Sequence, residues 1–217
     1  MLPVLHAHQF SSYSWKVLIA LYENSTPFSY RVIDSAEAMA ELAALWPLKK
    51  FPVLRDGEAI VIESSIIIEY LARHHPGPAR LIPESADAAL NVRFLDRFFD
   101  NYIQTPMQKL VADRMRAEGE HDARGVADAR LLLDQAYEWI DSRMGSTGWA
   151  AGQDFTLADC AAAPALFYAD WVHPVSKRFA ATRAYRARLM AHPSVARTVN
   201  EARPFRHLFP GGAPDRD

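Results

Sequence analysis

The sequence is poor in cysteine and lacks long apolar segments. Cys160 is the one cysteine among 217 residues, so the chain can form no internal disulfide and no cysteine cluster that binds a metal. This composition is typical of a reducing compartment. The first residues lack the basic and long apolar stretches of a secretory signal. We therefore expect a cytoplasmic protein, with Cys160 as a small buried hydrophobic residue.

Features that would indicate a membrane, a nucleic acid or a metal as partner are also missing. No apolar run reaches the ~18 residues that a membrane-spanning helix requires. The net charge is -2, whereas a nucleic-acid-binding domain usually presents a basic face. The eight histidines do not repeat at the spacing of metal ligands, so we expect no metal site. Half of the residues are hydrophobic, which suffices for a substantial core.

The first third of the chain alternates between strand-like and helix-like segments. Apolar or alternating runs predict the strands, and apolar residues at helical spacing or alanine-rich composition predict the helices. Asp56-Gly57 separates two apolar runs and predicts a hairpin, because glycine accepts positive φ without steric cost. The expected order is β-α-β-α-β-β-α, with strands at 2–6, 28–33, 52–55 and 59–62 and helices at 14–23, 36–45 and 65–74.

A proline-rich stretch at 75–83 divides this α/β part from a second part that lacks strand alternation. From Ala86 to Met115 apolar residues recur with a period near 3.6, which predicts a long helix that Pro106 kinks or divides. The tail from Pro210 is expected to be mobile at its end. Further helices are expected at 126–144, 157–173, 179–191 and 194–202. We expect an N-terminal domain at 1–76, a linker at 77–86 and an all-α domain at 87–217.

Two serines, Ser11 and Ser12, join the first strand to the first helix. A serine at this point can cap the helix by accepting a hydrogen bond from a free N–H group. Its hydroxyl can also help to stabilise an anion, because the free N–H groups and the helix dipole favour negative charge there. A thiolate at this position would gain a charge-assisted hydrogen bond. The residues alone leave both interpretations open.

Two further junctions of the α/β part carry polar side chains. In the stretch 49–53 (Lys-Lys-Phe-Pro-Val), the lysines form either a solvated turn or a site for a ligand carboxylate. Glu63 and Ser64 either cap the next helix or hold a free α-amino acid group. In the second case Glu63 meets the ammonium, and Ser64 with the helix N-terminus meets the carboxylate. Together the three junctions could recognise different parts of one anionic tripeptide thiol.

These motifs and their order resemble those of the N-terminal domain of cytosolic glutathione transferases. The stretches that carry the resemblance are Ser11-Ser-Tyr-Ser-Trp-Lys-Val, Pro47-Leu-Lys-Lys-Phe-Pro-Val-Leu and Glu63-Ser-Ser-Ile-Ile-Ile-Glu-Tyr-Leu. The first is most similar to the serine-serine-cysteine-serine-tryptophan stretch of the zeta class, with Tyr13 in place of the cysteine. Phe155-Thr-Leu-Ala-Asp159 is similar to the family's structural cap on a buried helix. The resemblance implies a thioredoxin-like N-terminal domain followed by an all-α helical bundle.

The resemblance also implies roles for individual residues. Ser11 matches the family's catalytic serine, and Ser12 is its neighbouring alternate. Tyr13 either lines the pocket for the second substrate, contacts the thiol or only packs, and Gln108 matches a zeta-class stretch that can line that pocket. The positions that match glutathione-binding residues are Lys50, Phe51, Pro52, Glu63 and Ser64, with Pro52 at the family's cis-proline.

The function implied is that of a homodimeric glutathione transferase with a role in detoxification. Glutathione would be the co-substrate, and its thiolate would attack an apolar electrophile bound between the domains. Two alternatives remain. One is a glutathione-dependent isomerase of the maleylacetoacetate type, and the other is a non-catalytic binding or interaction protein with the same fold.

Overall fold

The computed structural model describes residues 2–145 and 147–217, so Met1, at the start of the expected N-terminal domain, lies outside the described residues. A four-stranded sheet forms the N-terminal part in the order β2-β1-β3-β4. Strand β1 pairs parallel with β2 and antiparallel with β3, and β3 pairs antiparallel with β4. The strands are β1 (Val4–Ala7), β2 (Ser29–Val32), β3 (Val53–Asp56) and β4 (Ala59–Ile62). The predicted hairpin is confirmed, and Gly57 adopts the positive φ of +59° that this turn requires.

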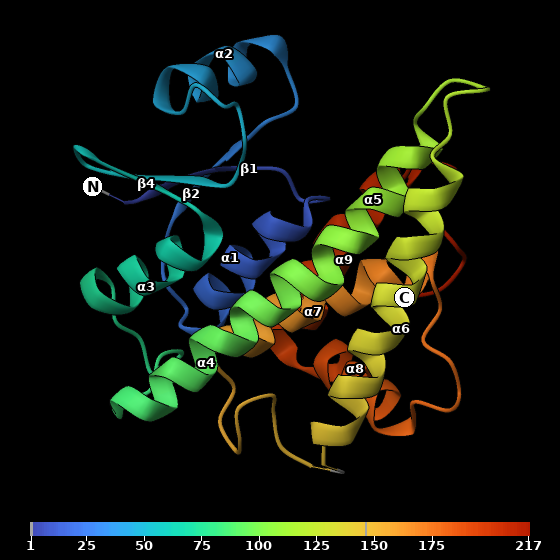
Figure 1. Cartoon of the computed structure of the whole chain (residues 1–217). Helices are drawn as coiled ribbons and strands as arrows, with labels where there is room; N and C mark the ends of the chain where they lie inside the picture. The colour runs from blue at the N-terminus through green and yellow to red at the C-terminus, as the bar shows by residue number, and fades with distance from the viewer. Residues whose placement is uncertain (1, 146) are drawn as a thin grey trace.

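Three helices cover the two faces of this sheet, α1 (Ser12–Glu23), α2 (Ala36–Leu45) and α3 (Ser64–His74). Side chains alternate along β1 and β3, so neighbouring residues enter different cores. Leu5 and Leu54 belong to the main core that α1 and α3 share with the helical part. Val53 joins a small separate core beneath α2. Figure 1 shows α2 on its own side of the sheet, which confirms the predicted thioredoxin-like layering.

The rest of the chain is helical, as predicted. The expected long helix is divided into α4 (Ala86–Phe98), a π-helical segment η1 (Phe99–Gln104) and α5 (Thr105–Arg114). Pro106 lies in the first turn of α5, where its missing N–H is tolerated, and the π-helical segment directly precedes it. The later elements are α6 (Ala123–Arg143), α7 (Leu157–Val172), α8 (Ala180–Ala191), α9 (Pro193–Ala202) and a 3₁₀ segment η2 (Arg203–Leu208).

Helix α7 lies at the centre of the molecule, and all of its residues are buried. The predicted cap at its start is present, since Thr156 and Asp159 form a reciprocal capping box. The Asp159 carboxylate also accepts hydrogen bonds from the Ala150 N–H at 2.9 Å and the Tyr185 hydroxyl at 2.6 Å. Cys160 is buried, as predicted, so its thiol is part of the core. Within the described residues no helix is long and apolar enough to cross a bilayer.

A buried cluster of charges joins the two parts of the molecule. Lys16 of α1 is fully buried, and its ammonium lies 2.5 Å from Asp96 and 2.8 Å from Asp100. It also donates a hydrogen bond to the Ser65 hydroxyl of α3 at 2.9 Å. These contacts connect α1 and α3 with α4 and η1. The cluster thereby fixes how the sheet domain sits on the helices that follow it.

The last residues of the C-terminal tail, for which mobility is expected from the sequence, form ion pairs with the helical part. Arg216 forms an ion pair with Asp170 of α7, and Asp217 forms ion pairs with Arg203 and Arg206. Glycine and proline in the tail indicate an irregular backbone. They do not reveal which distant charges lie within reach.

Candidate functional site

Two adjoining cavities lie where the sheet domain meets the helices, and Tyr13 and Phe51 line both. The larger, of about 430 Å³, is called the apolar cavity and runs along η1 and α5. The smaller, of about 250 Å³, is called the polar cavity and lies over the loops before β3 and α3. The lining of the polar cavity is Tyr13, Trp46, Lys50, Phe51, Pro52, Ile62, Glu63, Ser64, Arg97, Asp100 and Asn101.

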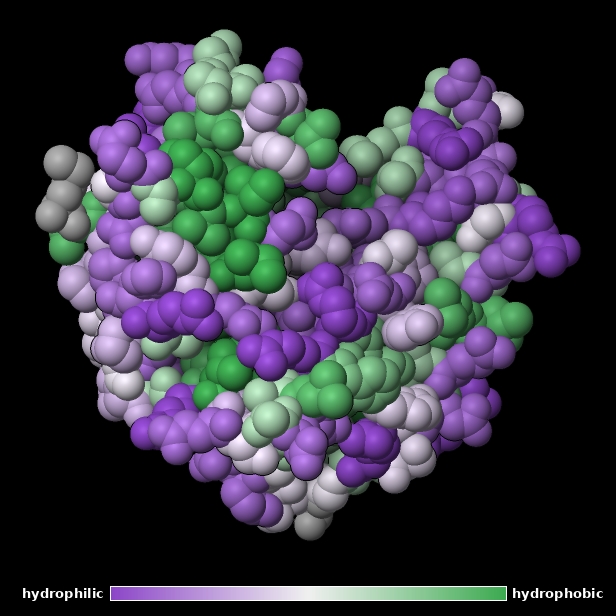
Figure 2. All heavy atoms as spheres, turned by 60° about the vertical axis from the view of Figure 1, so that its left-hand side comes forward, coloured by the Kyte–Doolittle hydropathy of each residue, from purple (hydrophilic) through white to green (hydrophobic). Residues whose placement is uncertain are grey.

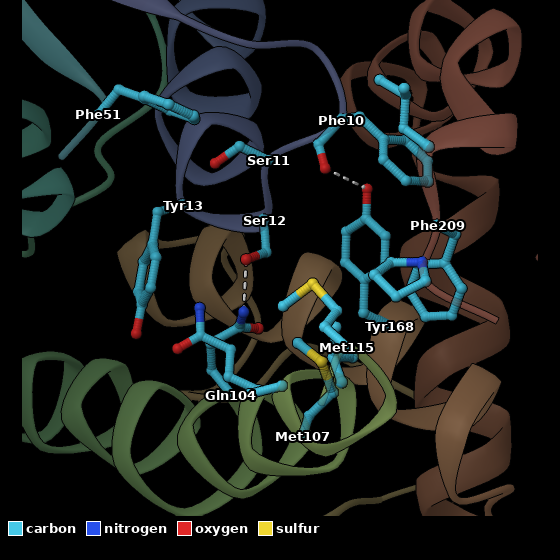
Figure 3. Close-up of a pocket in the computed structure, with 15 residues that line it drawn as sticks. Phe10, Ser11, Ser12, Tyr13, Phe51, Gln104, Met107, Met115, Tyr168 and Phe209 are labelled. Atoms are coloured by element: carbon cyan, nitrogen blue, oxygen red, sulfur yellow. Dashed lines mark hydrogen bonds between the residues drawn. The ribbon is translucent and has the colours of Figure 1, made fainter. Parts of the chain in front are cut away.

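Ser11 is the N-cap of α1 and lines the apolar cavity. Its oxygen accepts a hydrogen bond from the Ser14 N–H at 3.3 Å, so the predicted capping role is confirmed. A hydroxyl that accepts a hydrogen bond still has a proton to donate. In Figure 3 this hydroxyl faces the space beside Phe51. Ser11 can therefore cap the helix and donate to a ligand at the same time.

Ser12 follows at the first position of α1 and lines the same cavity. Its hydroxyl accepts a hydrogen bond from the side-chain amide of Gln104 (Figure 3). Gln104 is the last residue of the π-helical segment and is only 2% exposed. The amide oxygen of Gln104 is buried without a hydrogen-bond partner among the described residues. Sequence reasoning missed Gln104, because no motif marks a π-helical segment.

Tyr13 stands between the two cavities. Burial raises the pKa of its phenol to about 12, and the nearby Asp100 carboxylate adds to the shift. The side chain is therefore a neutral hydrogen-bond donor near neutral pH and cannot act as a phenolate base there. Figure 3 shows its hydroxyl directed away from the Ser11 side chain. This arrangement suits a residue of the cavity wall.

The five residues predicted to bind glutathione all line the polar cavity. The Phe51–Pro52 peptide bond is cis. Glu63 has an unusual positive φ of +67°, and its side chain does not cap α3, so the capping alternative is wrong for this residue. The N–H groups at the start of α3, from Ser64 onward, therefore receive no side-chain cap from Glu63. Ser64 lines a cavity that also holds Lys50, a cation on the loop before β3.

Sequence reasoning missed the contribution of α4 and η1 to this cavity. Arg97 and Asp100 line it and form an ion pair of 2.6 Å. Burial raises the pKa of the Asp100 carboxyl, and the Lys16 ammonium opposes that shift. A signal for this site does exist in the sequence. Asp96 and Asp100 are four residues apart, at the spacing that places them on one helix face with the apolar residues 92, 95, 99 and 103.

The lining of the apolar cavity carries no charged side chain among the described residues. Its polar groups lie together at one end, at Ser11, Ser12, Tyr13 and Gln104, while Gln108 lies one helical turn further along α5 and is exposed. The hydroxyl of Tyr168 is already bound to the Phe10 carbonyl at 3.1 Å. The remaining walls are Phe10, Phe51, Met107, Val111, Ala112, Met115, Leu208, Phe209 and Pro210. No group of three or more metal-ligating side chains is present in residues 2–145 and 147–217.

Comparison with known proteins gives matches over both parts of the chain. Residues 5–79 match the model of the glutathione S-transferase N-terminal domain, and residues 119–197 match that of the C-terminal domain. A crystal structure of a glutathione S-transferase from Methylobacterium radiotolerans, in complex with glutathione sulfonate, is 30% identical with a TM-score of 0.78, over 91% of this chain and 94% of that chain.

Two curated relatives illustrate the range of similar proteins. A probable maleylacetoacetate isomerase from Caenorhabditis elegans is 29% identical over 77% of this chain and 79% of its own length. FtsZ-localized protein A from Caulobacter vibrioides is 27% identical over 87% of each chain. Fold, cavities and matched domains agree, and the chain belongs to the glutathione S-transferase family of enzymes.

Proposed function

We propose that the protein is a glutathione transferase that binds glutathione in the polar cavity and its second substrate in the apolar cavity. The observation that carries this proposal is the meeting of three separate loops at one site. Residues 50–52, residues 63–64 and the start of α1 contribute to two cavities that share Tyr13 and Phe51. The thiol of a glutathione bound there would lie at the boundary, within reach of a second substrate in the apolar cavity.

The charges of the polar cavity suit the groups of the tripeptide. Glu63 can pair with the γ-glutamyl ammonium, while Ser64 and the N-terminus of α3 can hold its carboxylate. Lys50 can meet the glycine carboxylate at the other end. The backbone of Phe51, beside Pro52, is the proposed partner of the cysteinyl unit. Arg97 adds a second cation beside this set.

The proposed chemistry begins with ionisation of the glutathione thiol. The Ser11 hydroxyl donates a hydrogen bond to the sulfur and lowers the thiol pKa, because this bond favours the charged form. The free N–H groups and dipole at the start of α1 act in the same direction. The thiolate then attacks an electrophilic carbon of a substrate in the apolar cavity. That cavity has no charged lining group, so a neutral, apolar electrophile fits it best.

The proposal is tested by ultraviolet difference spectra of glutathione titrated into the protein over a range of pH. We expect a thiolate band well below the pH at which free glutathione ionises. Binding without that band indicates a carrier or a non-catalytic member of the family. No binding at all would remove the functional proposal and leave the fold alone.

A glutathione-dependent isomerase of the maleylacetoacetate type is the second candidate, favoured by the similarity to probable maleylacetoacetate isomerases. Its substrate is a diacid, and a buried carboxylate needs a counter-charge. The apolar cavity offers none among its lining residues, which favours the transferase. Incubation with glutathione and a cis-enone diacid distinguishes the two, since the isomerase returns the trans diacid without forming an adduct.

We further propose that the protein is a homodimer that acts in the cytoplasm, with detoxification as its role. Support for the dimer comes from exposed apolar side chains on neighbouring elements of one face. Ile60 of β4, Ile66 of α3 and Leu90 and Phe94 of α4 are between 40% and 66% exposed. Figure 2 shows that apolar patches interrupt the charged surface on the side where α3 lies. A partner that covers them would remove apolar area from water.

A further inference from the structure

The hydroxyl of Ser12 differs from that of Ser11 in its partner. Ser11 accepts a hydrogen bond from the backbone of its own helix, whereas Ser12 accepts one from the side-chain amide of Gln104 on the opposite wall. Gln104 is 2% exposed and is held by the π-helical segment, so its amide is not free to follow a ligand. The Ser12 oxygen therefore occupies a fixed position in the apolar cavity.

This contact has a chemical consequence for the Ser12 proton. Because Gln104 fills only an accepting position, the hydroxyl keeps its proton free to be donated to another group. A hydroxyl that accepts a hydrogen bond also becomes a stronger donor, because hydrogen bonds in a chain polarise one another. The start of α1 adds a positive potential at the same point. Ser12 is thus suited to bind an oxygen on which negative charge develops.

We infer that Ser12 is a catalytic donor to a carbonyl oxygen of the second substrate and that Gln104 is its positioning residue. Neutral, aryl-substituted enones are the substrates that would reveal this role. Their carbonyl oxygen would lie at Ser12, and their ring would lie among aromatic and methionine side chains such as Phe10, Met107 and Phe209. This inference rests on the proposed function, with Ser11 as the donor to the thiol.

The reaction step balances in atoms and electrons. The thiolate sulfur forms a bond to the β-carbon of the enone, and the electron pair of the C=C bond moves to join the α-carbon to the carbonyl carbon. The pair of the C=O bond moves to the oxygen, which becomes an enolate and accepts the hydrogen bond from Ser12. The α-carbon then takes a proton from water, using the electron pair of the enolate C=C bond, while the pair on the oxygen re-forms the C=O bond. The hydroxide that is left combines with the proton released when the thiol ionised.

The test compares two neutral aromatic electrophiles at saturating glutathione, benzylideneacetone and benzyl chloride. Attack on the first places charge on a carbonyl oxygen, whereas attack on the second releases chloride and forms no such oxyanion. For Ser12→Ala we expect kcat/KM with benzylideneacetone to fall about 10²-fold or more, the effect of one lost oxyanion donor, while that with benzyl chloride changes less than about tenfold. The ratio between the two electrophiles is the decisive quantity.

Gln104→Met tests the positioning role with a neutral side chain of similar length. Methionine has no side-chain N–H group, so the Ser12 hydroxyl loses the donor that fixes its position and can turn away from the substrate. We expect the same selective loss with benzylideneacetone. Gln108→Met is the matched control, because it makes the same change in the same cavity at a side chain that has no hydrogen bond to Ser12 among the described residues. We expect this control to change kcat/KM by the same factor with both electrophiles.

Each remaining outcome overturns the inference. An equal loss for both electrophiles in Ser12→Ala, with a raised pKa of the bound thiol, assigns Ser12 to the sulfur instead. Unchanged kinetics with benzylideneacetone in Gln104→Met remove the positioning role. A wild-type protein that shows the thiolate band but does not turn over benzylideneacetone excludes the substrate class. Absence of that band is the separate failure of the proposed function.

Discussion

At the scale of single residues, the Ser11 side chain has both a structural and a chemical role in the candidate site. Ser11 caps α1 through its oxygen and keeps its proton for a ligand. The sequence could predict the cap, since serine before an apolar helix is a common start signal. It could also suggest an anion site there. Only the folded chain shows Ser11 beside the cavity that Phe51 shares.

Replacement of this serine separates the two roles. For Ser11→Ala we expect kcat/KM to fall by about 10²–10³, the cost of one lost donor to an anion. The loss of the cap should lower the free energy of unfolding by only ~1 kcal/mol. Steady-state kinetics and urea unfolding on the same preparation measure both quantities. Full turnover in Ser11→Ala would show that the thiol has another donor.

A buried histidine makes stability depend on pH. His6 of β1 is 5% exposed, and neither ring nitrogen has a hydrogen-bond partner among the described residues. Burial lowers its pKa below the ordinary 6.5, and Arg55 and Arg31 act in the same direction while Glu41 opposes them. The unfolded chain therefore binds a proton at a higher pH than the native protein does. The stabilisation from neutral His6 is present above pH 6.5 and is lost as the pH falls toward the native pKa.

We therefore expect the free energy of unfolding to decrease as the pH is lowered from 7 through 6 toward 5, and the decrease to be smaller in His6→Leu. Urea unfolding of both proteins over this range measures the difference. Carboxylates and other histidines also titrate in this range, so only the difference between the two proteins reports on His6. Identical pH profiles would mean that His6 is protonated in the native state as easily as in the unfolded chain.

At the scale of elements, the π-helical segment η1 and the buried charges of α1 and α4 decide the shape of the site. The π-helical segment ends at Gln104, the residue that contacts Ser12. Helical periodicity predicts a helix through this region, and Pro106 predicts a break, but neither specifies a π-helical segment. Lys16 directly precedes the apolar residues 17–21 of α1, and its partners lie 80 and 84 residues away in sequence. Because of this separation, the stretch from Ser11 to Val17 alone could not reveal the ion pairs of Lys16.

Removal of the buried Lys16 ammonium should lower the free energy of unfolding far more than removal of an exposed cation. Lys16→Met leaves the half-exposed Arg97 as the remaining cation beside Asp96 and Asp100, and breaking a buried pair of this kind costs about 3–5 kcal/mol. Arg124→Met, which removes the exposed pair with Asp128, should cost below ~1 kcal/mol. Urea unfolding measures both. Equal costs in the two variants would contradict the view that this cluster holds the sheet domain on the helices.

At the scale of the whole molecule, the exposed apolar face on β4, α3 and α4 is the proposed dimer interface. Leu90→Glu places a charge on that face, and the cost of burying it should favour the monomer. Leu131→Glu is the control, because Leu131 is 59% exposed on α6, on the other side of the molecule from α3 in Figure 1. Sedimentation at micromolar concentration should show a monomer for Leu90→Glu and a dimer for the control. A wild-type monomer would reject the interface.

Local physical chemistry let the sequence determine the order of strands and helices, the hairpin at Gly57, the cap of α7 and the three loops that carry candidate ligand contacts. Periodicity, turn preferences and capping act over a few residues and are therefore visible in the chain itself. The contact of Gln104 with Ser12, the Lys16 cluster and the ion pairs of the last residues were decided by the tertiary structure. They join residues far apart in sequence, and such contacts depend on how helices pack and not on any local preference.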